Sequence, residues 1–244
     1  MAIAYVRDTG LLSASGASAV SGNFSGLPAV DNHVFHMVGW WGSASTTLVY
    51  SDNQAGNTWA NDKQETAPDL GQGTASIGSA KVVGSAGTFS ITATGGSSSY
   101  YHSVGVEFSG ILASAAHLDQ TGKDSLGLVS SITVTASAPN SQADALVLGA
   151  VGTGGNGTNI HISHVTPPPA TGFTGLAVDQ DSNTIVAFEA CYKIVAAGET
   201  SSVTWSHDTL ATEGISGVIT TYKPSAGGGG GNNPPSGRTV IISG

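Results

Sequence analysis

The eight residues VFHMVGWW, at positions 34–41, constrain the fold more than any other part of the chain. In a β-strand, alternate side chains point to opposite faces of the sheet. One face here would carry Phe35 and its odd-numbered neighbours, and the other face Trp40 and its even-numbered neighbours, so both faces are apolar. A buried helical segment reads similarly over eight residues, but turn-forming residues on both sides limit the run to strand length. The sequence therefore predicts a central strand that packs on both faces.

Short bursts of apolar and β-branched residues recur along the chain at intervals of roughly ten residues, with turn signals between them. They predict strands at 2–7, 11–24, 34–41, 46–50, 58–60, 75–83, 88–94, 100–108, 131–136, 143–151, 184–195, 202–206 and 215–222. The strands at 75–83 and 88–94 are expected to form a hairpin, and 63–73 and 118–127 are expected to be polar loops. No window has helical spacing. We expect one all-β domain over residues 1–223, an antiparallel β-sandwich of jelly-roll type, with a closed barrel as the lesser alternative.

Charge excludes several classes of partner. Only 9% of the 244 residues are charged, against about 25% in an average globular protein, and the formal net charge is −9. The seven Lys and Arg residues are scattered singly, so no basic footprint for nucleic acid exists. An anionic membrane surface is disfavoured for the same reason, and no apolar run is long enough for a transmembrane helix. We expect neither nucleic acid nor membrane as a partner.

The cysteine content and the first residues indicate where the chain folds. The single cysteine, Cys191, excludes an internal disulfide. The sequence starts without a basic segment followed by a long apolar run, so no secretory signal is expected. Folding in a cytoplasm without disulfides is the expectation.

Residues that could carry chemistry do not form a convincing site. His33 and His36, like His161 and His164, are three residues apart, so regular strand geometry would place the members of each pair on opposite faces. The oxygen-rich segments at 52–57 and 179–183 lack full calcium-loop spacing and read better as turns. Cys191 lies mid-strand, and no nucleophile elbow or phosphate loop occurs. We expect a non-enzymatic protein with no cofactor and no metal.

The composition changes after Lys223. Residues 224–237 are rich in Gly, Pro and Asn, which predicts a flexible linker with a root-mean-square span of about 20 Å. Residues 238–244 are β-prone and predict a terminal strand arm. Such a strand can add to the exposed sheet edge of another subunit. It can also dock on its own domain or remain a frayed tail, and all three alternatives stay open. The candidate partner-binding residues are Arg238, Thr239, Val240, Ile241 and Ile242.

Several segments, read in order, resemble a β-sandwich module that recurs in phage virion structural proteins and bacterial surface proteins. The segments are 34–42, the turn DNQAGNTW at 52–59, GVEFSG at 105–110, ALVLGA at 145–150 and GVITTYKP at 217–224. The resemblance covers roughly residues 1–223. It implies a jelly-roll-like sandwich with a structural or surface-binding role and no catalytic residues to carry over.

The missing secretory signal shifts the expectation from a secreted bacterial protein to a virion component assembled in the host cytoplasm. We expect a homo-oligomeric structural protein of the phage particle that decorates or cements the capsid through contacts with other virion subunits. The sequence does not distinguish a place on the head from one on the tail.

Carbohydrate binding is the rival hypothesis. A module of a virion fibre or surface protein would bind a host-surface glycan or receptor, because sandwich folds often stack sugars on exposed aromatic rings. The candidate rings are Trp59, Tyr100, Tyr101 and Trp205. The alternative role for these four side chains is packing in the core or at its rim, so their exposure discriminates the two hypotheses.

Overall fold

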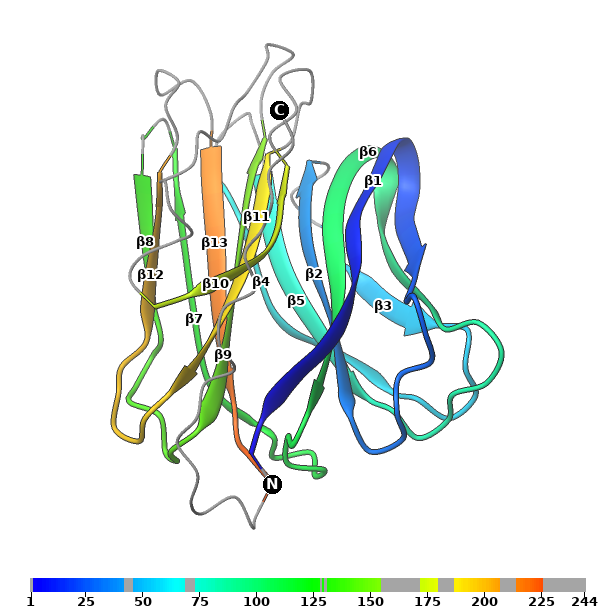
Figure 1. The fold of residues 1–244 in the computed structure, drawn as a ribbon. Coiled ribbons are helices and arrows are strands. Elements are labelled where there is room, and N and C mark those ends of the chain that lie inside the picture. Colours follow the sequence, from blue (N-terminus) through cyan, green and yellow to red (C-terminus); the bar gives the residue numbers. More distant parts are fainter. Residues whose placement is uncertain are drawn as a thin grey trace, which may run out of the picture.

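We describe a computed structural model that defines residues 2–41, 46–68, 73–127, 129, 131–154, 172–179, 187–206 and 214–225. These residues form thirteen strands and contain no helix. All strand pairs are antiparallel. The predicted fold class, an all-β antiparallel sandwich, is confirmed (Figure 1).

Each half of the chain builds one sheet. The first sheet has the order β1-β6-β2-β5-β4, with β3 paired to β6, and the second has the order β10-β11-β9-β13-β7. A separate ribbon pairs β12 with β8. The first-sheet strands are β1 (Ala4–Asn23), β2 (His33–Trp41), β3 (Val49–Asp52), β4 (Trp59–Thr66), β5 (Gly73–Lys81) and β6 (Ser90–Ser109). The remaining strands are β7 (Leu118–Leu126), β8 (Ser131–Thr135), β9 (Ala145–Gly154), β10 (Thr174–Asp179), β11 (Phe188–Val195), β12 (Ser202–Ser206) and β13 (Gly214–Tyr222).

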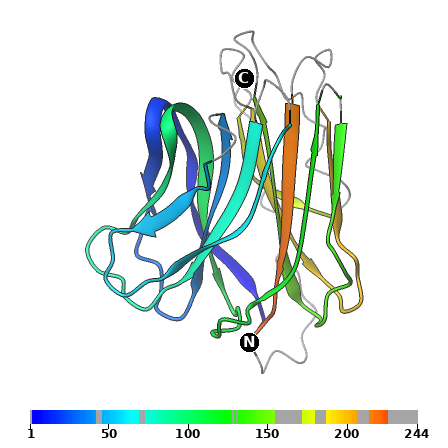
Figure 2. The same cartoon turned by 180° about the vertical axis from the view of Figure 1, so that it is seen from behind.

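The two sheets face each other, as the two opposite views show (Figures 1 and 2). The main core fills the space between them and takes alternate side chains from the central strands of both. Its largest members are Phe35, Met37 and Phe108 of the first sheet and Phe188 and Tyr222 of the second. Strand β2 lies between β6 and β5 and is almost wholly buried, which confirms the predicted central strand.

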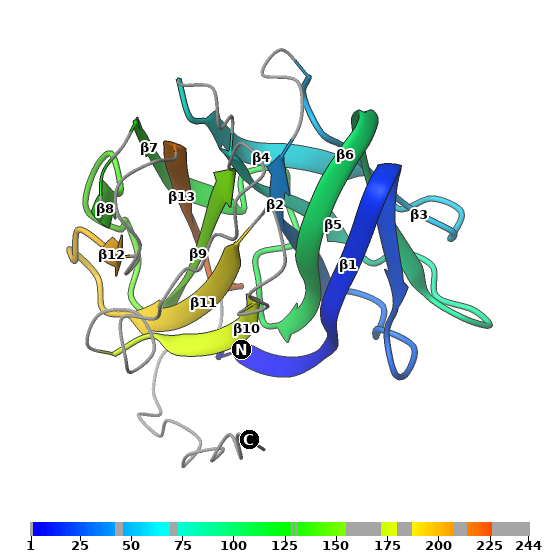
Figure 3. The same ribbon diagram turned by 90° about the horizontal axis from the view of Figure 1, so that it is seen from above.

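The first sheet covers its own outer face by curling. Strands β1 and β6 are each 20 residues long and bend away from the sandwich (Figure 3). Four register shifts interrupt their pairing, and Gly10 and Gly16, both with positive φ, lie at two of them. Bulges of this kind bend a strand and increase its twist. The curled strands enclose a second apolar cluster built around Trp40, Tyr50 and Tyr101.

The second sheet obtains its outer cover from a separate element. The β8–β12 ribbon lies over the face of β9, β11 and β13 that points away from the first sheet. Between them, Trp205 of β12 packs with Cys191 and Ile219, and all three are buried. The molecule therefore has three apolar layers, but the two outer ones are built differently.

The structure corrects several expectations about single segments. The ranges 75–83 and 88–94 do not form a hairpin, because β5 and β6 lie on opposite sides of β2. Residues 118–126 form strand β7 instead of a loop, and the first part of the other expected loop, 63–66, belongs to β4. Both polar segments become strands because they lie at sheet edges, where one face meets solvent. The two strands expected at 2–7 and 11–24 form one bulged strand, and β10 was not predicted.

Candidate functional site at the root of the C-terminal segment

Strand β13 delivers the chain to a fixed exit point at the end of the sandwich where the N-terminus also lies (Figure 1). Three backbone hydrogen bonds hold the three residues after β13. Lys223 N donates to His117 O at 2.8 Å, Leu112 N donates to Lys223 O at 2.9 Å, and Ser225 N donates to Gly110 O at 2.7 Å. Pro224 adds an antiparallel bridge with Ile111. We call residues 110–117 together with 223–225 the C-terminal root.

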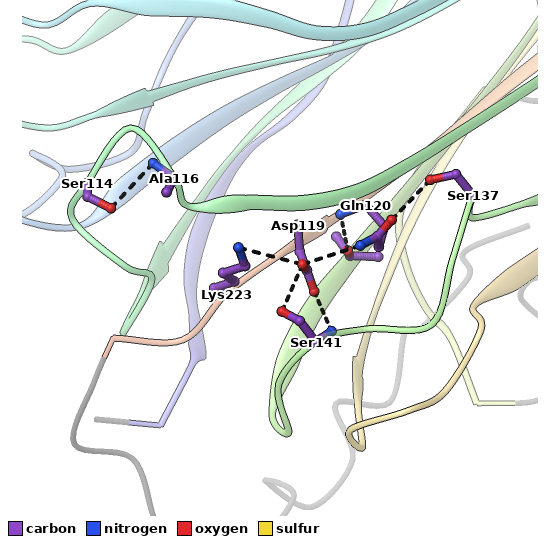
Figure 4. Close-up of polar contacts among 8 residues, drawn as sticks. Ser114, Ala116, Asp119, Gln120, Ser137, Ser141 and Lys223 are labelled. Carbon is purple, nitrogen blue, oxygen red and sulfur yellow. Dashed lines mark hydrogen bonds and ion pairs between the residues drawn. The ribbon is translucent and has the colours of Figure 1, made fainter.

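The buried carboxylate of Asp119 links the root to neighbouring parts of the domain (Figure 4). Asp119 accepts hydrogen bonds from Ser141 N at 2.7 Å and Ser141 Oγ at 2.8 Å, and its Oδ1 lies 3.7 Å from Lys223 Nζ. Its neighbour Gln120 accepts a bond from Ser137 Oγ at 3.1 Å. These contacts tie the start of β7 to the β8–β9 turn and to the end of β13, so the root is part of the folded domain.

A chain of polar side chains connects the root to the interior. Tyr222 donates its hydroxyl to Asp62 Oδ2 at 2.6 Å, and Asp62 is also hydrogen-bonded to Ser79. Ser79 Oγ lies 3.2 Å from His117 Nε2, and His117 Nδ1 lies 3.0 Å from Ser114 O. The His117 ring also stacks on Tyr222, with the ring centroids 5.7 Å apart. Sequence patterns did not reveal this set, because its members are spread over four elements.

A buried histidine faces this chain. The His33 ring lies 5.0 Å from the His117 ring, and neither nitrogen of His33 has a hydrogen-bond partner among the described residues. Desolvation, followed by the charges of His117 and Lys81, lowers the pKa of His33 to about 3. Burial raises the pKa of Asp62, although its hydrogen bonds from Ser79 and Tyr222 and the charge of His117 oppose the rise. The ring of His33 is therefore neutral at pH 7.

The predicted partner-binding residues, Arg238 to Ile242, lie outside the described residues, as do His161 and His164. Within the described part of the chain, no group of three or more His, Cys, Asp or Glu side chains could hold a metal ion. The carboxylate of Asp52 accepts bonds from Gln54 N, Asn57 Nδ2 and Trp59 Nε1, which is turn chemistry and leaves its oxygens occupied. Cys191 is buried, and burial raises the pKa of its thiol.

The structure separates the four candidate sugar-stacking rings. Tyr101 is fully buried against Trp40, and Trp205 is 1% exposed under the β8–β12 ribbon, so neither ring can stack on a sugar. Trp59 is half-buried and stacks on Tyr50, with its indole N–H bonded to Asp52. These three rings serve packing, and the hypothesis is wrong for Tyr101 and Trp205.

Tyr100 differs from the other three candidates. It is half-buried and lies opposite Trp41 on neighbouring strands, with the two ring centroids 5.6 Å apart and the planes tilted by 51°. Residue 73, the partner of Trp41 on β5, is a glycine, and the backbone of Thr153 and Gly154 of the second sheet fills the place of its missing side chain. Sequence reasoning missed Trp41 because it was assigned to the core with the rest of its strand.

Comparison with known proteins gives no relative. No family model, curated protein or solved structure matches the chain. A search of the described residues for a helix long and apolar enough to cross a membrane also finds none. The resemblance to virion and surface modules therefore stays a prediction from the sequence.

Proposed function

We propose that the protein is a non-enzymatic structural component of a phage virion that decorates or cements the capsid through its C-terminal strand arm. The observation that carries the proposal is the C-terminal root. It fixes the start of the arm by three backbone hydrogen bonds at one end of a rigid sandwich. Beyond it, the sequence supplies a Gly- and Pro-rich spacer and then RTVIIS, a segment of high β-propensity.

A fixed root and a β-prone end suit strand addition to a neighbouring subunit. Main-chain hydrogen bonds to an exposed edge supply affinity, and alternate side chains supply specificity. Alternation would place Val240 and Ile242 on one face of the added strand and Ile241 on the other. The low charge and small side chains of the domain suit close contact between repeated copies. Partners are then other virion subunits, including further copies of this chain.

Binding to particles that lack the component tests the proposal. Full-length protein and a variant ending at Ser225, which keeps the root intact, are mixed with such particles and sedimented. We expect saturable binding at a lattice-like stoichiometry for the full-length chain and loss of binding for the truncated one. Equal binding of both forms would show that the arm is not the anchor, and binding of neither would overturn the capsid role.

A double variant separates the contribution of the strand from that of the linker. We expect V240D with I242D to abolish co-sedimentation, because two charges on one face of an added strand would face the acceptor subunit. T239S, in the same segment, serves as the matched control and is expected to bind as the full-length protein does. Unchanged binding of the double variant would remove the arm from the mechanism.

A glycan-binding module remains the second candidate, and the Trp41–Tyr100 pair favours it. Both rings are partly exposed, and no hydrogen bond occupies the indole N–H or the phenol within the described residues. Stacking on such rings, with polar tips left for hydroxyl groups, is a chemistry that binds sugars. We expect W41A and Y100F to weaken binding to a host-surface glycan, with W59F as the control. A glycan screen without a hit for the parent protein would end this candidate.

A further inference from the structure

The side chains that connect the C-terminal root to the interior form a chain of hydrogen bonds. The donor of each bond in this chain can be assigned. We call the set the terminal latch; it consists of His33, Asp62, Ser79, His117 and Tyr222. His117 supplies its last link, since its carbonyl oxygen accepts the bond from Lys223 N. Whatever disturbs the His117 ring therefore acts on the segment that holds the start of the arm.

The acceptor at one end of the latch fixes the tautomer of His117. The carbonyl of Ser114 can only accept, so His117 Nδ1 must carry a proton in this 3.0 Å contact. A neutral His117 then accepts the Ser79 hydroxyl proton at Nε2. In that case Ser79 cannot donate to Asp62, and Asp62 must be protonated to keep their hydrogen bond.

The alternative arrangement moves two protons together. An imidazolium at His117 donates from Nε2 to Ser79 Oγ, and Ser79 donates to an ionised Asp62, which also accepts from Tyr222. In both arrangements Asp62 and Nε2 of His117 share one proton. A second proton on this pair leaves the Ser79 hydroxyl hydrogen without an acceptor in the chain and the imidazolium without a counter-charge.

His33 makes the arrangement still less tolerant of acid. Its ring is 0% exposed, its two nitrogens have no partner among the described residues, and His117 lies 5.0 Å away. The other charged groups around His33 do not stabilise a protonated His33 ring. Lys81 of β5 is positive and is paired with Asp31 at 2.7 Å, and Glu107 of β6 lies on the opposite face of the sheet, paired with Arg7.

We propose that the terminal latch holds the C-terminal root closed at neutral pH and releases it in acid, before the sandwich itself unfolds. Protonation of His33 requires water, and the 110–117 connection is the covering element that can move without breaking a sheet. Opening of this connection frees Lys223 and the residues after it. The inference concerns the described root alone and does not depend on what the arm binds.

Hydrogen exchange of individual amides tests the latch in the intact protein. We expect the protection factors of the amides of Leu112, Lys223 and Ser225 to fall about tenfold per pH unit between pH 6.5 and 5, the slope for uptake of one proton. The amide of Met37 in central β2 is expected to stay more protected throughout. A pH-independent protection factor at the three root amides would overturn the proposal.

Two substitutions assign the slope to the latch. In H33F the root amides should lose the part of the slope that His33 contributes, whereas H36Q, which changes another buried histidine of β2, should keep the whole slope. S79A should lower protection of the Lys223 amide already at pH 7.5, because the middle link is gone. If H33F keeps the wild-type slope, the latch is not the sensor. If H33F does not fold, H33L replaces it, and the wild-type comparison of root and β2 amides is decisive without either variant.

Discussion

The two halves of this molecule solve the same problem differently. Each sheet has one face in the shared core and an outer face to cover. The first sheet curls its own long strands over that face, around Trp40, whereas the second sheet is covered by the short β8–β12 ribbon, around Trp205. A curled sheet covers itself with strands that are already paired, but a separate ribbon depends on side-chain packing. We therefore expect the first outer layer to unfold with its sheet and the second to come off locally.

The largest effects should come from removing the two central tryptophans of these layers. W40A and W205A should each cost about 3–5 kcal/mol, as expected for a buried Trp truncated to Ala. Urea unfolding measures the cost, and hydrogen exchange measures where it falls. We expect W205A to expose the β8–β12 amides selectively and W40A to lower protection across the first sheet. Identical exchange patterns in both variants would break the comparison.

The next largest effect is expected at the seam between the sheets, where Gly152 lies against Thr74 and Gly39 of the opposite sheet. A side chain at Gly152 would run into the backbone of Thr74 on the opposite sheet. G152A should therefore cost about 3 kcal/mol, since backbone must move. G22A is the matched control, because the three nearest atoms to a side chain there all belong to the half-buried side chain of Leu12. Equal thermal stability of the two variants would show that the seam can relax.

Acid should act on the two sheets with opposite sign. Burial lowers the pKa of His36, inside the curled first sheet, to about 3 and raises the pKa of Glu189, in the second sheet, to about 7. Below pH 6.5 His36 binds a proton in the unfolded state but stays neutral in the folded state, so the unfolding free energy falls as pH falls. Folded Glu189 binds its proton before the unfolded state does, so stability rises as pH falls from 7 towards 4.5.

Unfolding free energies at pH 7.5 and 5 measure both effects. Between pH 7.5 and 5, the unfolding free energy of H36Q relative to that of the parent should rise by about 2 kcal/mol. The variant lacks the imidazole whose protonation favours the unfolded parent. Over the same interval, the unfolding free energy of E189Q relative to that of the parent should fall by about 2–3 kcal/mol, because the variant lacks the carboxyl group that takes up a proton in the folded state. Taking the difference between two pH values cancels the packing cost of each substitution. A variant with the pH profile of the parent would contradict its assignment.

The smallest effects are expected at matched surface pairs. Ser21 and Thr92 form an exposed cross-strand hydroxyl pair at 2.8 Å in the first sheet, and Thr133 and Thr204 form one at 2.7 Å in the ribbon. S21A and T204A should each change stability by less than about 0.5 kcal/mol. A larger loss for T204A would show that the ribbon is held by its edges as well as by its apolar face.

The sequence predicted what depends on local pattern. The continuous apolar run at 34–41 and the alternation in 202–206, with turn residues limiting the first, placed β2 and β12 almost to the residue. It also predicted the all-β class. The pattern was misleading for the polar edge strand β7. An edge strand exposed on one face has too few apolar residues to show the two-residue period of a strand.

By itself the sequence determined where most strands run, that β2 is central, and that no segment carries a cluster of Lys and Arg. Only the tertiary structure decided which strands pair, since a period of two fits any partner equally well. That pairing placed β5 and β6 on opposite sides of β2, brought Trp41 beside Tyr100, and buried Tyr101 and Trp205. It also joined Asp62, Ser79 and His117, residues from three separate segments, at the root of the C-terminal segment. Contacts between such distant residues follow from strand register and sheet packing, which no local window of sequence contains.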